Sequence, residues 1–266
     1  MPMLVRKTLR EYRRALIGWT IGICTFIGLY VSFFPQMRDN PDFYSQAALA
    51  KYPEGVRKLM GGLENFTSGA GFLQAVVYQL FVPLLFIMCA VILGNKAIAA
   101  PEESGTLELT VTLPVDRKRL VLERFAALAA GLLAVAVVSL TVLTVLAAAV
   151  DMDVPFGRIL AAHIALYLLV LFFGTLALTV GAATGNKGLA MGVAGAYAVA
   201  GYVFTALSRD SQVMDVLSRL TPFHYYSEGN PLVNGLPVGD CLVLLAGTAV
   251  LALTAVLSFD RRDVGV

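Results

Sequence analysis

Charged side chains are scarce in this sequence. Asp, Glu, Lys and Arg make up 14% of the 266 residues, whereas a soluble domain carries about 25%. Hydrophobic residues make up 58%, which exceeds the roughly 45–50% of soluble domains. The composition therefore excludes an ordinary soluble domain and indicates an integral membrane protein. The formal net charge of +2 gives no reason to expect nucleic-acid binding.

Cysteine and the residues of catalytic and metal sites are also sparse. The three cysteines, Cys24, Cys89 and Cys241, are odd in number and lie in or beside apolar runs, so no disulfide framework is expected. The sequence contains no CxxC or HExxH motif and no recognisable Ser/His/Asp constellation. Apart from thiols and phenols, His163 is the one titratable candidate well inside an apolar run, where a hydrogen-bonded packing role is favoured over a proton relay. We expect no catalytic residue, no metal site and no cofactor in this chain.

The few charges leave six uncharged runs that are long enough to cross a bilayer as helices. A transmembrane helix needs about 20 apolar residues, and a charge at its centre costs roughly 2.5–3.5 kcal/mol. We predict an all-α integral membrane protein in which residues 1–266 form a single transmembrane domain. Buried core helices of a soluble protein are the alternative, which six such runs in one chain disfavour. The predicted spans are 15–34, 72–94, 125–150, 159–184, 188–207 and 241–259.

Lys and Arg are distributed unevenly over the segments that join these spans. If the N-terminus is inside, the inner segments hold thirteen of the 20 Lys and Arg residues and the outer segments hold seven. Because basic residues favour the cytoplasmic side, we predict a multi-pass protein of the cell membrane with both termini in the cytoplasm. The outer loops are then 36–71 and 208–240. In the second, we expect either short helices that dip into the outer leaflet, with Tyr225 and Tyr226 at interface depth, or an ordinary hydrated loop.

The first residues form a basic amphipathic pattern with helical period. Apolar side chains share one face and the bases occupy the other. Such a helix lies in the headgroup layer with its bases toward anionic lipid. The alternative is an ordinary positive flank of the first span. The apolar face consists of Leu4, Val5, Leu9, Tyr12 and Leu16.

Pairs of glycines four residues apart occur along the spans. Close approach of helices in lipid relies on small residues, because the hydrophobic effect does not drive helix association there. We therefore predict tight contacts of the first and fifth spans, either within the chain or with a second copy of it. The pairs are Gly18 with Gly22, Gly181 with Gly185, and Gly188 with Gly192.

The stretch "GAATGNKG" at 181–188 has a superficial likeness to a phosphate-binding loop. That loop requires Gly-Lys followed by Ser or Thr, after a strand. Here Gly188 follows Lys187, and the flanking residues are apolar spans. We expect no ATP binding by this route.

The most polar stretch is "PEESGTLELTVTLPVDRKRL" at 101–120, in the one sizeable inner segment. Apolar and polar residues alternate from Leu107 to Leu113, but a lone strand has no sheet to join. The competing prediction is a short helix that begins near Thr106 and is stopped by Pro114, after which Asp116 caps the next helix. Exposed apolar residues beside carboxylates indicate a docking site. A loop folded back on the chain's own helix ends is the alternative.

This stretch resembles the inner loop of ABC exporter permeases of the type-2 class, which reads roughly acidic-acidic-x-GTLE, five residues, then P-V-x-R. The resemblance extends to the basic N-terminal helix, the six spans and the aromatic segment before the last span. It implies that the stretch is a cytoplasmic coupling helix between spans 2 and 3, to which we add Leu109 as a contact residue. The residues that match are Glu102, Glu103, Gly105, Thr106, Leu107, Glu108, Pro114, Val115 and Arg117.

The resemblance also implies partners. The coupling helix would insert into a groove of a separate cytoplasmic ATPase subunit, and two permeases, identical or related, would work with two ATPases. ATP and magnesium would then bind the ATPase and not this chain, which would export an apolar or amphiphilic substrate such as a drug, peptide or lipid. The alternatives are a scaffold that anchors a partner without transport and a subunit of a membrane enzyme complex.

Overall fold

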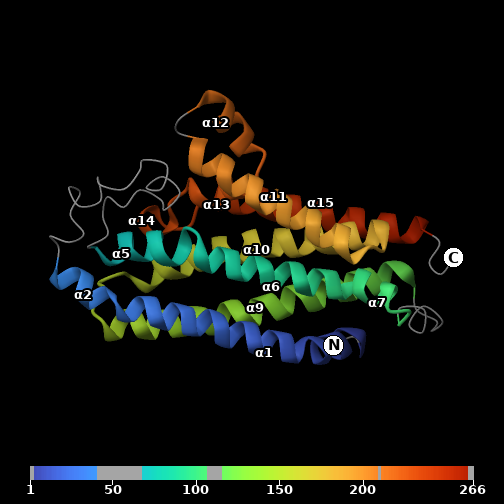
Figure 1. Cartoon of the computed structure of the whole chain (residues 1–266), viewed down its shortest axis with the longest axis horizontal. Helices are drawn as coiled ribbons and strands as arrows, with labels where there is room; N and C mark the ends of the chain where they lie inside the picture. Colours follow the sequence, from blue (N-terminus) through green and yellow to red (C-terminus); the bar gives the residue numbers. More distant parts are fainter. Residues whose placement is uncertain (1–2, 41–67, 107–115, 209–210, 263–266) are drawn as a thin grey trace.

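The computed structural model describes residues 3–40, 68–106, 116–208 and 211–262 of the chain. Over these residues the fold is all-α and contains no strand. Six helices are long and apolar enough to cross a membrane, and they lie side by side in one bundle (Figure 1). The predicted all-α membrane fold is therefore confirmed. The six long helices are α1 (Met3–Ser32), α6 (Phe81–Ala97), α9 (Arg117–Ala149), α10 (Phe156–Thr184), α11 (Lys187–Leu207) and α15 (Val238–Arg261).

The second predicted span, 72–94, is one helix in the sequence analysis but three consecutive pieces in the structure. A short helix α5 (Gly69–Phe72) runs into a π-helical turn η3 (Leu73–Tyr78), and α6 begins after a break at Leu80, whose φ is −130°. Pro83 lies in the first turn of α6. Because proline has no backbone N–H, it cannot bond the carbonyl one turn earlier, so a continuous helix across 79–83 is disfavoured. Pro83 was a visible signal for this break.

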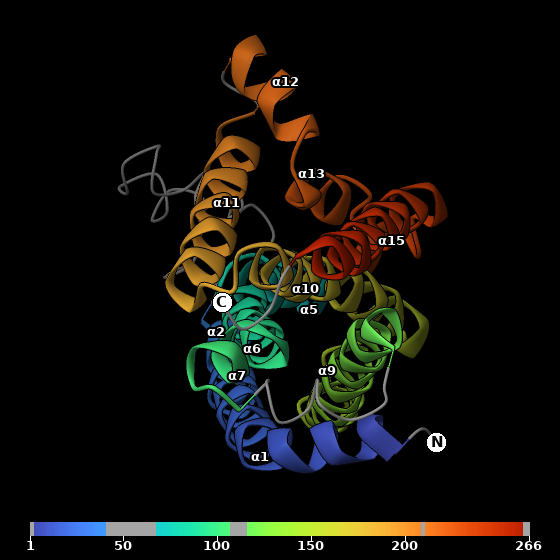
Figure 2. The same cartoon turned by 90° about the vertical axis from the view of Figure 1, so that its right-hand side faces the viewer.

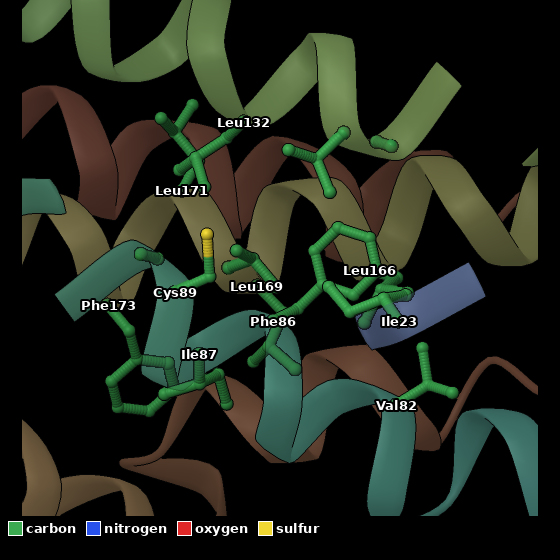
Figure 3. Close-up of a cluster of buried hydrophobic side chains, with 14 of the residues drawn as sticks. Ile23, Val82, Phe86, Ile87, Cys89, Leu132, Leu166, Leu169, Leu171 and Phe173 are labelled. Atoms are coloured by element: carbon green, nitrogen blue, oxygen red, sulfur yellow. The ribbon is translucent and has the colours of Figure 1, made fainter. Parts of the chain in front are cut away.

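Helix α10 is the centre of the bundle. It packs against α6, α9, α11 and α15, and Figure 2 shows α11 and α15 on one side of it with α6 and α9 on the other. Helices α6 and α10 are the two most buried of the six. Figure 3 shows their side chains in the core, where Phe86 and Ile87 of α6 lie near Leu169 and Phe173 of α10. The other long helices expose more of their apolar surface, which would face lipid in a bilayer.

The backbones of α6 and α10 approach each other closely in this core. A methyl group added at Gly94 would lie 2.2 Å from the carbonyl oxygen of Gly174. On the opposite helix, a methyl group added at Gly174 would lie 3.2 Å from the Cβ of Ala90. Small residues on both helices therefore let the two backbones touch, as expected for helices that associate in lipid.

One end of the bundle carries the first and the last residues that the structure describes. Helix α1 begins there, α15 ends there, and the short helix α7 (Ala99–Glu103) lies beside them (Figure 1); we call this the terminal end. Figure 2 shows the first turns of α1 crossing beneath α9. Val5 and Tyr12 on the predicted apolar face are buried, and Leu9 and Leu16 are half-buried. The predicted basic N-terminal helix is thus present, and it continues without a break into the first span.

The opposite end, which we call the far end, carries short helices. They include α2 (Phe34–Asp39), α12 (Gln212–Arg219), α13 (Pro222–Ser227) and α14 (Pro231–Asn234). Both views show α12 standing away from the bundle next to the end of α11. Segment 208–240 thus forms short helices over much of its described length, while their predicted position in the outer leaflet stays a prediction.

A buried polar cluster fixes α13 to the bundle. Tyr226 is buried, and its hydroxyl donates to the Tyr78 carbonyl at 2.6 Å. The Tyr78 hydroxyl lies 2.5 Å from His163 Nδ1, and Ser139 Oγ lies 3.4 Å from His163 Nε2. His163 is therefore a hydrogen-bonded packing residue, as predicted. Tyr226 anchors α13 inside the bundle, and its predicted depth at the membrane interface stays a prediction.

Candidate functional site

The candidate site is the polar stretch 101–120 at the terminal end, of which the structure describes the two flanks. The first flank, 101–106, contains the last residues of α7, and the second, 116–120, begins α9. Four of the predicted coupling residues, Leu107, Glu108, Leu109 and Pro114, lie outside the described residues, and so does the predicted short helix between Thr106 and Pro114. The geometry of the site is therefore that of its flanks.

The first flank is bound to the chain's own C-terminal residues through Glu102. Its carboxylate forms an ion pair with the guanidinium of Arg262, the residue that follows α15. Both side chains are about four-fifths buried, with 19% and 22% of their surface exposed. Arg262 Nη1 also donates to the carbonyl of Ala182 at 3.1 Å, in the last turn of α10. Partial burial lowers the pKa of Arg262 from its ordinary value, but an arginine in a protein stays charged.

The second flank also contacts Arg262, through the backbone of that residue. Arg117 Nη1 donates to the carbonyl oxygen of Arg262 at 2.8 Å. The next residue, Lys118, forms an ion pair with Asp260 at 3.3 Å. Asp116 caps α9, because its Oδ1 accepts a hydrogen bond from the Lys118 N–H at 3.1 Å, which confirms the predicted cap. Both flanks of the stretch are therefore joined to the end of α15.

Glu103 contacts the start of the fifth span. Its Oε1 accepts a hydrogen bond from the backbone N–H of Lys187 at 2.7 Å, at the N-terminus of α11. A carboxylate is favourable there, because the first N–H groups of a helix have no intrahelical partner and the helix dipole is positive at that end. Asn186 Oδ1 accepts the Leu189 N–H at 2.8 Å and completes the cap.

The stretch "GAATGNKG" is the turn that joins α10 to α11. Gly185 ends α10 with a φ of +67°, a conformation that glycine adopts without steric cost. A methyl group at this position would lie 2.6 Å from Glu102 Oε1 and 2.5 Å from Arg262 Nη2. Gly181 packs under α7, since its added methyl group would lie 3.1 Å from the Cβ of Ala99. This stretch is therefore a tight turn pressed against α7.

The two carboxylates face the chain itself in this conformation. Glu102 and Glu103 contact helix ends of the same chain, as in the alternative of a loop folded back on the chain's own helix ends. Ser104, Gly105 and Thr106 are exposed, and both hydroxyls donate to the Pro101 carbonyl at 3.1 Å. They form a surface turn at the terminal end, with Gly105 at a φ of +70°. The coupling role of these residues stays a prediction.

The predicted packing glycines fall into two groups. A methyl group at Gly18, Gly22 or Gly192 would have no described atom within 4 Å, and at Gly188 it would meet only the neighbouring Asn186 side chain. These four positions make no close helix contact among the described residues. What remains of the prediction for them is contact with a second copy of the chain. Gly181 does make a close contact, while Gly185 is needed for the conformation of the turn.

Sequence reasoning missed Arg262 as well as the Gly94–Gly174 contact. Arg262 was counted only as a basic residue of the cytoplasmic tail, and its bonding partners lie 80 and more residues away in the chain. No local pattern carries that information. In the part of the chain that the structure describes, no group of three or more His, Cys, Asp and Glu side chains could hold a metal ion.

One comparison with known protein families matches nearly the whole chain. A family model described as "ABC-2 family transporter protein" matches residues 3–264. No curated protein matches the chain.

Proposed function

This chain belongs to the ABC-2 family of transporter proteins, and from that premise we propose that it is the permease subunit of an ATP-driven exporter whose ATPase is a separate subunit. It lies in the cell membrane with both termini in the cytoplasm. ATP and magnesium bind the ATPase, whose closure moves the coupling stretch 101–120 and, through it, the spans.

The observation that carries this proposal is the position of the coupling stretch. Helix α7 and the start of α9 both lie at the terminal end (Figure 1), so both flanks of the coupling stretch lie there. This is the end at which α1 begins with its bases and α15 ends. A polar stretch with the type-2 pattern, held at both flanks on one end of a membrane bundle, is suited to receive a soluble partner.

Two further features support the finer parts of the proposal. Gly188 and Gly192 leave an open strip on α11, which suits close packing with a second permease. Half-buried aromatic side chains, Phe172 of α10 and Tyr197 of α11, lie between these two helices, and aromatic side chains of this kind suit an apolar or amphiphilic substrate. We propose a working unit of two permeases and two ATPases.

The test of this function is co-purification from native membranes. Tagged permease, extracted in mild detergent, is expected to bring down an ABC ATPase in a one-to-one ratio, and the material should hydrolyse Mg-ATP. Recovery of permease free of any ATP-hydrolysing protein would overturn the proposal. A complex without a nucleotide-dependent change in the exposure of far-end residues would support a scaffold and not a transporter.

One substitution locates the docking surface. Leu107→Asp places a charge without a partner in the predicted contact, at a cost of about 1–3 kcal/mol, which corresponds to roughly a 5- to 150-fold loss of ATPase affinity. The matched control is Leu236→Asp, an exposed residue between α14 and α15 at the far end. The control should retain the ATPase. Equal recovery with both variants would show that the stretch does not dock the partner.

A further inference from the structure

We infer that Arg262 is a positioning residue that ties α7 and the first turn of α9 to the α10–α11 turn and to α15, so that these pieces move together. This inference rests on the proposed function, because it assigns a path for a movement that the ATPase would begin. Its structural part depends only on the described contacts of Arg262, Glu102 and Arg117.

Arg262 joins four helices through three kinds of bond. Its guanidinium pairs with Glu102 of α7 and donates to the Ala182 carbonyl of α10. Its own carbonyl accepts from Arg117 of α9 at 2.8 Å, and its backbone continues α15. We call the set Glu102, Arg117, Ala182 and Arg262 the clasp. Removing one partner of an ion pair that is largely shielded from water is costly, because it leaves the other charge buried and unpaired.

The clasp matters because α7 is a separate short helix and not a continuation of α6. Between α6 and α7 the backbone leaves the helical region at Ile98, with φ −135° and ψ −58°. Such a residue interrupts the run of helical hydrogen bonds. After α7 comes Gly105 at a φ of +70°. A displacement that arrives at α7 is therefore passed on through its side contacts, which are Glu102 with Arg262, Glu103 with the α11 N-terminus, and Ala99 with Gly181.

These contacts lead from α7 to α10, α11 and α15. Glu102 and Ala99 reach the end of α10, which packs against four other long helices. Glu103 reaches α11, and Arg262 reaches α15. Helix α7 is thus linked to the ends of three spans, α10, α11 and α15. Arg262 also binds the start of a fourth span, α9. Without Arg262, α7 keeps the contact of Glu103 with α11 but loses its links to α15 and α9.

The inference is tested by the response of the far end to nucleotide in the complex of permease and ATPase. The native cysteines are replaced, a single cysteine is placed at Asn234, which is exposed in α14, and its rate of reaction with an impermeant thiol reagent is measured with and without Mg-ATP in lipid discs. Arg262→Gln removes the charge, and Arg262→Lys keeps it. The matched control is Arg261→Gln, an exposed neighbour with the same loss of charge.

We expect Arg262→Gln to reduce the nucleotide-dependent change in labelling rate at least fivefold, while ATPase recovery and basal hydrolysis stay within twofold of the parent. Arg262→Lys should retain an intermediate response, and Arg261→Gln the full response. The exchange Glu102→Arg with Arg262→Glu should restore part of the response lost in Arg262→Gln, which a role in general stability would not predict.

Two results would overturn the inference. The first is a full nucleotide response in Arg262→Gln, which would show that the clasp does not transmit movement. The second is loss of the ATPase itself in this variant, which would make Arg262 part of the docking surface. Failure of the proposed function is a different result, since the parent protein would then bring down no ATPase.

Discussion

Adding one methyl group at Gly94 is expected to destabilise the bundle at its centre. In Gly94→Ala the new Cβ would lie 2.2 Å from the carbonyl oxygen of Gly174, 3.1 Å from the Gly174 carbonyl carbon and 3.3 Å from the Cβ of Ala177. The nearest atom belongs to the backbone in the middle of α10, so no side-chain rotation can relieve the overlap. The helices themselves must move apart.

The size of the effect follows from the overlap. A carbon and an oxygen in ordinary contact are about 3.3 Å apart or more, so α6 and α10 would have to separate by roughly 1 Å. Overpacking of a core costs about 1–3 kcal/mol, and we expect the upper end here because α10 packs against four other long helices. Alanine recovers up to about 1 kcal/mol through its better helix propensity. The net destabilisation is about 2 kcal/mol, which is roughly a 30-fold fall in the ratio of folded to unfolded protein.

The assay is thermal unfolding in detergent, followed by the fluorescence of Trp19, the one tryptophan of the chain. The matched control is Gly195→Ala, the same chemical change in the interior of α11, where a methyl group would have no described atom within 4 Å. Gly94→Ala should unfold several degrees below the parent protein, and Gly195→Ala at or slightly above it. Equal unfolding midpoints for the two variants would refute the close crossing of α6 and α10.

Two more predictions concern the membrane and the second copy. Asn234→Cys at the far end should react with an impermeant thiol reagent in intact cells, and Ser104→Cys at the terminal end should not, because the bases gather at the terminal end; labelling of Ser104→Cys from outside would reverse the orientation. Gly18→Leu and Gly188→Leu should weaken association of two permeases without affecting insertion, since neither position packs closely against another described helix of its own chain. An assembly of unchanged size on a sizing column with both substitutions would exclude these faces.

The spans could be predicted from the sequence because charged side chains are costly inside a membrane, so uncharged runs mark the spans. Five of the six uncharged runs became single long helices and the second became three consecutive pieces, and Asp116 was identified as a cap from its place before the third. Rules based on neighbouring residues were sufficient for the features that neighbouring residues determine. The break before α6 also has a local cause, Pro83, so it could have been predicted from the sequence.

Packing could not be predicted in the same way. Spacing identifies two glycines on one face of one helix, but it does not say whether that face meets a neighbour. The pair that does bring two backbones together, Gly94 and Gly174, consists of one glycine from each of two helices. In a sequence that is 58% hydrophobic, almost every helix face is apolar, so composition does not separate the core face from the lipid face. The clasp was hidden for a related reason, because its partners come from four separate stretches.

The ion pairs of the described residues show a further difference between the two ends of the bundle. At the terminal end, three pairs join different helices: Glu102 with Arg262, Lys118 with Asp260, and Arg124 with Glu11. The described pairs of the far end are local, since each joins residues no more than four positions apart in the chain.

This difference bears on how a movement would spread. Interhelical ion pairs hold helix ends in a fixed arrangement, particularly where a charge is as buried as Arg124, which is 4% exposed. The start of α9 takes part in two of these ion pairs, through Lys118 and Arg124, and Arg117 adds a hydrogen bond to the carbonyl of Arg262. The described terminal end is therefore joined between helices by charged groups, while the described far end is joined by apolar packing and by hydroxyl bonds such as that of Tyr226. In the proposed exporter, a push received near α7 would be passed to the helix ends that these charged groups join.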